Sequence, residues 1–304
     1  MDQGSVLPSQ QVCRTEICRG TKYYRPWLNP CAILFIFLLS GCSGSADMEA
    51  RGRAGSQSEH LGPTLPFTLP SLETLPADDR SDLIRLGYHL VAHTQEYARA
   101  YVGNALNCTN CHLNAVRTPH SAPFVGLAMV FPEYRARNAR VNRLEDRLDD
   151  CFERSMNGRP LPPESRDKAA LIAYIEWLSE GVSKEAVSSW RGFRRIASSR
   201  QPDPARGQVL FKARCGACHG ADGQGTAIAP PMWGPRSYNI GAGMARMSLA
   251  ASFIKESMPL GQGGSLSDED AYDLAAFINR QPRPDFAKKH LDWPQGGKPV
   301  DTLY

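Results

Sequence analysis

Two short motifs, each a pair of cysteines followed by a histidine, constrain this chain more than any other feature. They read CTNCH at 108–112 and CGACH at 215–219. C-x-x-C-H is the attachment signature of c-type haem, in which both thiols form thioethers and the histidine becomes an axial ligand of the iron. A zinc site, a redox dithiol and a disulfide are the alternatives, but none of them requires a histidine directly after both pairs. The sequence predicts two covalently bound haem c groups, with thioether residues Cys108, Cys111, Cys215 and Cys218 and proximal ligands His112 and His219.

Both motifs have the same surroundings. In each case a helix runs into the motif, and an amphipathic helix follows after a loop. Apolar residues at helical spacing predict these helices at 82–104, 204–214, 166–181 and 267–281. We expect Asp78 or Ser81 to cap the first of them. The predicted fold is mostly α, with two tandem cytochrome c-type haem domains at 77–192 and 193–286 and a tail at 287–304.

The N-terminal segment of the sequence predicts an export signal. Four basic residues (Arg14, Arg19, Lys22 and Arg25) precede the apolar run CAILFIFLL at 31–39, which is too short to span a bilayer. The run ends in LLSGC, which resembles a bacterial lipobox, so we expect a signal peptide at 1–41 and lipidation of Cys42. An ordinary signal peptide cut near Ser45 or Ala46 is the alternative. A Ser-, Gly- and Pro-rich linker is predicted at 42–76, and the expected location is the bacterial periplasm, tethered to the membrane as a lipoprotein.

The spacing within the two halves also suggests the second axial ligand of each iron. Pro123 follows His112 by 11 residues, as Pro230 follows His219. Met258, in a Met-Pro context, follows His219 by 39 residues, and Cys151 follows His112 by the same 39. We therefore predict His/Cys ligation in the first domain and His/Met ligation in the second. A buried structural thiol is the other interpretation of Cys151, and the competing ligands are Met129 and Met156 in the first domain and Met232, Met244 and Met247 in the second.

The neighbours of Cys151 suggest an anionic substrate. If 141–156 is a helix, Arg147, Cys151 and Ser155 share one face, and Leu144, Leu148 and Phe152 form the stripe that packs inward. Arginine binds oxyanions through several donors at once. Residues 134–154 hold six Arg against five Asp and Glu, so we expect most of these arginines to lie in surface salt bridges. Only Arg147 is selected by geometry.

Three segments resemble the thiosulfate dehydrogenases, dihaem cytochromes c that form tetrathionate. They lie at 103–115, 131–158 and 230–279, and the resemblance covers roughly 80–285. It implies that the His112/Cys151 haem is the active site, with Arg137, Arg147 and Ser155 near the substrate; Arg137 enters by resemblance alone. It also implies that the His219/Met258 haem passes electrons on. Some members of the family carry a lysine beside this methionine as an alternative ligand, where this chain has Ser257.

These observations together predict an enzyme that joins two thiosulfates into tetrathionate, in a reaction that is reversible in principle. The expected partners are thiosulfate or tetrathionate and a periplasmic or membrane electron acceptor such as a small cytochrome c. A formal net charge of +4, without a basic run, excludes nucleic acid, and the lipid anchor is the only expected contact with the membrane. Two other functions stay open: a non-catalytic, membrane-tethered dihaem electron-transfer cytochrome, and an enzyme that transfers thiosulfate to a carrier protein.

Overall fold

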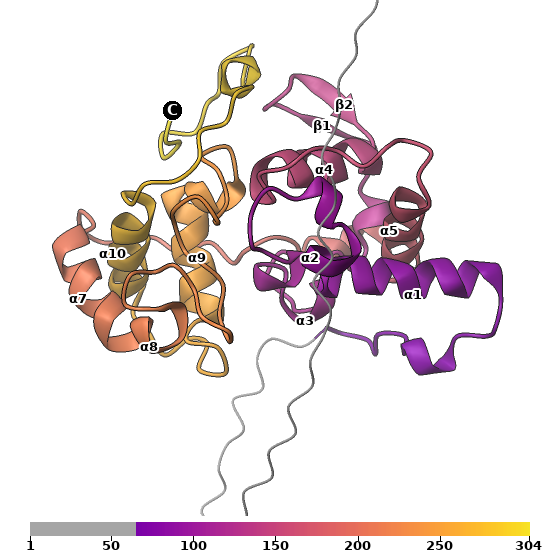
Figure 1. Cartoon of the computed structure of the whole chain (residues 1–304), viewed down its shortest axis with the longest axis horizontal. Coiled ribbons are helices and arrows are strands. Elements are labelled where there is room, and N and C mark those ends of the chain that lie inside the picture. Colours follow the sequence, from indigo (N-terminus) through magenta and orange to yellow (C-terminus); the bar gives the residue numbers. More distant parts are fainter. Residues whose placement is uncertain (1–64) are drawn as a thin grey trace, which may run out of the picture. The chain divides into compact units, whose positions relative to one another are not determined.

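The computed structural model describes residues 65–304, and this part of the chain is mostly helical (Figure 1). The predicted signal peptide, Cys42 and most of the predicted linker lie outside the described residues. Within them the strands form one antiparallel hairpin, β1 (Glu133–Arg135) and β2 (Arg140–Asn142), with Tyr134 opposite Val141. The helices are α1 (Asp79–Ala92), α2 (Thr94–Tyr97), α3 (Leu113–Val116), α4 (Leu144–Asp150), α5 (Arg166–Trp177), α6 (Lys184–Val187), α7 (Pro204–Arg214), α8 (Gly216–His219), α9 (Met247–Ser257) and α10 (Asp268–Asn279).

In the first domain, α1 packs across α5. Asp78 caps α1, because its carboxylate accepts a hydrogen bond from the N–H of Ser81 at 2.8 Å. The two helices approach closely at Gly87, where a Cβ atom would lie 2.2 Å from the carbonyl oxygen of Ala170. The predicted helix at 82–104 is interrupted at His93 (φ −128°, ψ 47°), so α1 ends at Ala92 and the short α2 follows.

The second domain repeats this crossing with α7 and α10. Asp203 caps α7 directly before Pro204, and Ser267 caps α10. A Cβ atom on Gly207 would lie 2.0 Å from the carbonyl oxygen of Asp273, so a glycine again allows the backbones to meet. Each pair of helices covers its own core: Ile84 and Tyr174 are fully buried in the first, and Leu274 in the second. The described residues therefore form two helical domains with the same crossing, in the tandem order that the sequence predicts.

The segment around Cys151 differs in part from its prediction. The predicted helix at 141–156 begins only at Leu144, because Arg140–Asn142 pairs as strand β2. After Asp150 the helix widens into a π-helical turn, η5 (Cys151–Ser155), in which the N–H of Met156 donates to the carbonyl of Cys151. The predicted inward stripe is confirmed, since Leu144, Leu148 and Phe152 are all buried.

Helix α9 carries many of the apolar contacts of the second domain, and the sequence analysis did not anticipate it. Ala250, Ala251 and Ile254 are buried in the core that Phe211 and Leu274 also occupy. Among residues 65–304, no helix has the length and apolar character needed to cross a bilayer.

Among the polar contacts that join the domains, two involve buried side chains. The hydroxyls of Ser121 and Ser257 lie 2.8 Å apart, and the side chain of Asn239 donates to the carbonyl of Glu153 at 2.8 Å. The tail adds a third contact, because both Oδ atoms of Asp292 accept hydrogen bonds from Arg154 at 2.8 Å. The side chain of Asp292 is only 2% exposed, so the C-terminal segment is a packed part of the fold.

Candidate active site

A largely apolar cavity in the first domain brings together the residues predicted to hold a haem. Its lining includes Cys108, Cys111, His112 and Cys151, and it encloses about 970 Å³, including the space at its mouth. Apolar side chains complete the walls, among them Phe124, Leu148, Met156 and Leu171. Of the two competing methionine ligands, Met156 lines this cavity, whereas Met129 is 45% exposed and does not.

His112 is prepared to act as a ligand through one ring nitrogen. Its Nδ1 lies 2.6 Å from the carbonyl oxygen of Ala122, so Nδ1 carries the proton and Nε2 keeps its lone pair. Burial lowers the pKa of His112 to about 4, which keeps the imidazole neutral at physiological pH. A neutral imidazole with a fixed tautomer, inside an apolar cavity that also holds two thiols, fits a c-type haem.

The same histidine geometry occurs in the second domain. Nδ1 of His219 lies 2.8 Å from the carbonyl oxygen of Pro230. In both domains the segment at the predicted proline provides the carbonyl that accepts a hydrogen bond from the histidine, with one difference. In the second domain the proline itself supplies the acceptor, whereas in the first the acceptor is Ala122, directly before Pro123.

Burial disfavours the thiolate at three of the four attachment cysteines. Burial raises the pKa of Cys108 to about 11 and that of Cys215 to about 11 as well, and burial with the neighbouring Cys108 raises the pKa of Cys111 to about 12. Thiol exchange needs the thiolate, which these groups do not form at neutral pH. All five cysteines in the described part of the chain are free thiols, and no group of three or more His, Cys, Asp or Glu side chains in that part could hold a metal ion. The raised thiol pKa values disfavour the redox dithiol alternative.

The structure does not single out one methionine for the second domain. Met232, Met244, Met247 and Met258 are all partly buried against the core that contains Phe211. Met258 lies directly after α9, with its N–H bonded to the carbonyl of Ile254. Met244 also packs against the first core and lines the first-domain cavity, so it lies between the two sites. His219/Met258 ligation therefore stays a prediction.

Cys151 is in contact with a cation. Nη1 of Arg147 lies 2.9 Å from its Sγ atom, one turn away along α4 and η5. A guanidinium at this distance stabilises negative charge on sulfur, and the low dielectric of the cavity strengthens the attraction. The predicted proximity of Arg147 to Cys151 is thus present in the fold.

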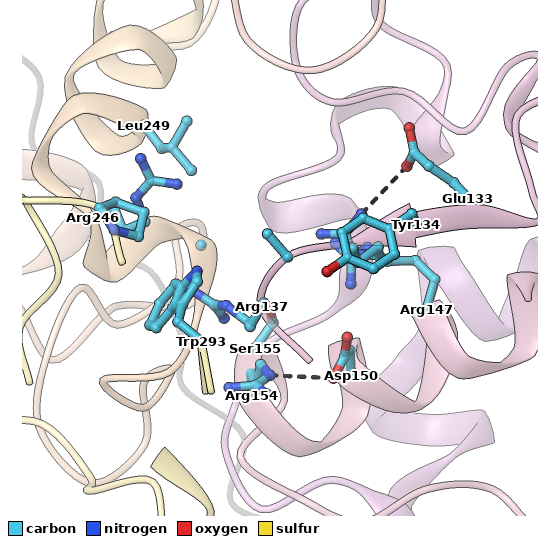
Figure 2. Close-up of a pocket in the computed structure, with 14 residues that line it drawn as sticks. Glu133, Tyr134, Arg137, Arg147, Asp150, Arg154, Ser155, Arg246, Leu249 and Trp293 are labelled. Atoms are coloured by element: carbon cyan, nitrogen blue, oxygen red, sulfur yellow. Dashed lines mark hydrogen bonds and ion pairs between the residues drawn. The ribbon is translucent and has the colours of Figure 1, made fainter. Parts of the chain in front are cut away.

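An arginine-lined pocket adjoins the haem-sized cavity. Arg147 and Ser155 line both spaces, as do Gly243 and Leu249. The pocket encloses about 1000 Å³, including space open to solvent, and is lined by five arginines: Arg135, Arg137, Arg147, Arg154 and Arg246. Figure 2 shows Arg147 on the side of Glu133 and Arg246 on the opposite side, beside Leu249. A pocket with this lining suits a small, multiply charged anion.

Arg137 and Arg154 are held in place by the tail. Arg137 donates to the carbonyl of Gly241 at 2.7 Å, and its guanidinium lies 4.5 Å from the ring centre of Trp293. Arg154 forms its bidentate pair with Asp292, and its Nε donates to Asp150 at 3.3 Å. Tyr304 also donates to Asp292, and burial together with this hydrogen bond raises the pKa of Tyr304 to about 12. The tail thus supplies one wall of the pocket.

Four curated proteins similar to this chain share one name. It is 38% identical to a thiosulfate dehydrogenase of Psychrobacter arcticus over 271 residues, covering 87% of this chain and 82% of the relative. It is 45% identical to a thiosulfate dehydrogenase of Allochromatium vinosum over 234 residues, covering 74% of this chain and 87% of the relative. The chain belongs to the thiosulfate dehydrogenase family.

Other comparisons agree with this membership. Residues 94–183 match the family described as SoxA/TsdA, cytochrome c domain, and residues 202–278 match the family described as cytochrome C oxidase, cbb3-type, subunit III. A solved thiosulfate dehydrogenase (TsdBA) of Marichromatium purpuratum is similar with a TM-score of 0.69 and 36% identity. The match covers 72% of this chain and 50% of that one, so this family member spans about half the length of the solved chain.

The arginines of this family member differ from one expectation. We expected most arginines at 134–154 to lie in surface salt bridges, but four of the six line the pocket. Only Arg140 and Arg143 form exposed pairs, with Asp146 and Glu145. Sequence analysis also missed Arg246, Trp293 and the tail carboxylates. Arg246 and the tail lie far from Cys151 in sequence, and no local pattern links them to it.

Proposed function

We propose that this protein joins two thiosulfate ions into tetrathionate and passes two electrons, one at a time, to an external acceptor. A bond forms between the two sulfane sulfurs, so 2 S₂O₃²⁻ become S₄O₆²⁻ and two electrons leave. As a thiosulfate dehydrogenase family member with two cytochrome c domains, the protein is a haem-dependent thiosulfate oxidoreductase. The proposal that tetrathionate is formed rests on the 2.9 Å contact between Arg147 and Cys151. Arg147 lines both the arginine pocket and the cavity.

The pocket residues would overcome the main electrostatic obstacle to this reaction. Two dianions must approach each other, and their repulsion in a low-dielectric site is large. Arginines fixed before the substrate arrives offset that repulsion without reorganising during the reaction. Arg137 and Arg154 are fixed by their contacts with Trp293 and Asp292, while Arg147 is oriented toward Sγ of Cys151.

Haem c would be held in the first domain by the thiols of Cys108 and Cys111, with His112 and Cys151 as axial ligands. When bound, it supplies one-electron redox chemistry and a coordination position next to the pocket. In this proposal His112 stays neutral, and its Nδ1–H keeps its bond to Ala122. Cys151 would hold the haem and provide sulfur for contact with substrate, because its Sγ atom lies 2.9 Å from Arg147, which lines both the cavity and the arginine pocket.

The second domain would provide the electron exit. Cys215 and Cys218 would attach its haem, with His219 and Met258 as ligands. A thioether ligand raises a haem's potential relative to a thiolate, so electrons would move from the first domain to the second. A small c-type cytochrome is the class of acceptor that we propose.

The location of the protein is part of the same proposal. We place it in the bacterial periplasm, tethered through a lipid on Cys42, because the run at 31–39 and the LLSGC ending suit a lipoprotein signal. c-type haem attachment outside the cytoplasm is consistent with this location.

A stoichiometric assay tests the proposed reaction. Purified holo-protein is mixed with thiosulfate and ferricyanide, and tetrathionate is quantified by chromatography. We expect one tetrathionate for every two thiosulfates consumed and every two ferricyanides reduced, and no reduction without thiosulfate. Haems that exchange electrons with ferricyanide but show no thiosulfate-dependent turnover would instead indicate a non-catalytic carrier. Thiosulfate consumption only in the presence of a carrier protein, without tetrathionate, would indicate thiosulfate transfer.

A further inference from the structure

Tetrathionate carries a sulfonate group at each end, so a site that forms it must hold two anionic ends. This point rests on the proposed function. Arg147 and Ser155 lie at the end of the arginine pocket nearest Cys151, called the inner end, because Arg147 contacts the Sγ atom of Cys151 at 2.9 Å. The remaining four arginines line the pocket alone.

These four arginines differ in how many donors they leave free for a ligand. Within residues 65–304 the Arg135 side chain forms only a 3.7 Å ion pair, with Glu133. Burial and the charge of Arg147 act to lower the pKa of Arg135, so it lies on the Arg147 side of the pocket. All three nitrogen positions of Arg154 are engaged by Asp150 and Asp292. Arg137 already donates to Gly241 and packs on Trp293. Arg246, by contrast, uses only Nε, which donates to Asp301 at 3.0 Å. Within residues 65–304, neither Nη group of Arg246 donates to an acceptor. Both Nη groups are therefore available to bind an oxyanion.

The position of Arg246 is fixed from the tail. Oδ2 of Asp301 accepts from the backbone N–H of Ser248 at 3.0 Å and also from the Ser248 hydroxyl, which ties the tail to the first turn of α9. Burial acts to raise the pKa of Asp301, but the hydrogen bonds from Ser248 and Arg246 lower it overall, so the carboxylate is ionised. The Arg246 side chain is 23% exposed, which leaves it accessible from the pocket.

We propose that Arg246 binds the sulfonate of the second thiosulfate, which becomes the outer end of tetrathionate, and that Asp301 is a positioning residue for it. Figure 2 shows Arg246 across the pocket from Arg147. The inner thiosulfate lies against Arg147 and Ser155, and the outer one against Arg246. The two sulfane sulfurs then point toward each other between them.

Tetrathionate affinity tests this assignment. Ferric holo-protein is titrated with tetrathionate by calorimetry, and thiosulfate binding at the first haem is followed separately through its ferric EPR signal. In Arg246→Gln we expect tetrathionate to bind roughly tenfold more weakly or worse, because a charged hydrogen-bonding pair is lost, with thiosulfate binding at the inner end changed less than about twofold. Arg143→Gln removes the same charge from an exposed site outside the pocket and is the matched control.

A double-mutant cycle tests the role of Asp301. Asp301→Asn should weaken tetrathionate binding in the parent protein but add little in the Arg246→Gln background, because both changes act through one side chain. Additive losses would overturn the positioning role. Arg246→Lys keeps the positive charge but replaces the planar guanidinium with a single ammonium group. We expect it to bind tetrathionate more tightly than Arg246→Gln but more weakly than the parent protein.

Different results would contradict the outer site at Arg246 and the proposed reaction. If the parent protein forms tetrathionate and Arg246→Gln binds it with unchanged affinity, the outer site is overturned and the proposed function stands. Equal losses of thiosulfate and tetrathionate binding would overturn it as well, since Arg246 would then act on the inner end. If the parent binds tetrathionate through Arg246 but forms none from thiosulfate, the outer site is upheld and the proposed reaction fails.

Discussion

Cys151 differs from the other four described cysteines in its nearest neighbour. The pKa values of Cys108, Cys111 and Cys215 are raised by burial, whereas Sγ of Cys151 accepts a hydrogen bond from the guanidinium of Arg147. A nearby cation makes a thiolate available as ligand and nucleophile. This contact is the observation on which the proposed reactive role of Cys151 rests.

Near-infrared absorption can show whether Met258 is the sulfur ligand of the second haem. We expect Met258→Gly to abolish the weak near-infrared sulfur-to-iron band and to lower the potential of the second haem, because a thioether ligand is lost. Met247→Leu and Met244→Leu are the matched controls and should keep the band, which near-infrared absorption of the ferric protein would record. Loss of the band in either control, with Met258→Gly unchanged, would move the ligand to that residue.

At the level of helices, each domain depends on a glycine where two of its long helices cross. Gly87 of α1 lies against Ala170 of α5, and Gly207 of α7 lies against Asp273 of α10. Neither glycine is needed for a positive φ, since both lie inside helices. The close approach of two backbones is the reason for each.

Replacing Gly207 by alanine tests this packing. Within a helix such a change normally stabilises by about 1 kcal/mol, but here the new Cβ would lie 2.0 Å from a carbonyl oxygen. We expect Gly207→Ala to lower the free energy of unfolding by about 1–3 kcal/mol through overpacking, measured by denaturant titration with circular dichroism. Val209→Ala, at an exposed position of the same helix, should change it by less than about 0.5 kcal/mol. A more stable Gly207→Ala protein would contradict the close approach.

Across the whole molecule, segments far apart in sequence line the arginine pocket of the candidate active site. The hairpin and α4 provide Arg135 and Arg147, the start of α9 provides Arg246, and the tail provides Trp293. The buried pairs Ser121–Ser257 and Asn239–Glu153 hold the two domains together. Neither domain alone would form the complete pocket.

The two attachment motifs predict the haem content of the whole protein. The mature protein should carry two haems that remain with the polypeptide after acid–acetone extraction, quantified by pyridine haemochrome absorbance. A Cys215→Ser/Cys218→Ser protein should retain one of them, because the first attachment motif is untouched. Finding one haem in the parent protein, or zinc in place of haem, would contradict the architecture.

Local patterns explain how much of this could be predicted from the sequence. The attachment motifs, the helical cap at Asp78 and the stripe of Leu144, Leu148 and Phe152 depend on neighbours in sequence, and the fold contains them as expected. The π-helical turn η5 and the β1–β2 hairpin depend on tertiary packing and were not expected. The roles of Arg246, Asp292 and Asp301 depend on contacts across more than 50 residues, for which hydrophobic periodicity has no signal.

The central claim is that Cys151 is a thiolate ligand at the site where thiosulfate reacts. It is tested most directly by ferric EPR spectra of Cys151→Gly and Cys151→Met beside their rates of tetrathionate formation. We expect both proteins to keep two haems, because neither His112 nor a thioether cysteine is changed. Cys151→Gly should lose the low-spin thiolate signal, its first haem should shift to higher potential, and turnover should fall by orders of magnitude. Cys151→Met should regain a low-spin iron without regaining activity. Unchanged EPR signals and near-normal rates in Cys151→Gly would contradict the claim and return Cys151 to a structural role.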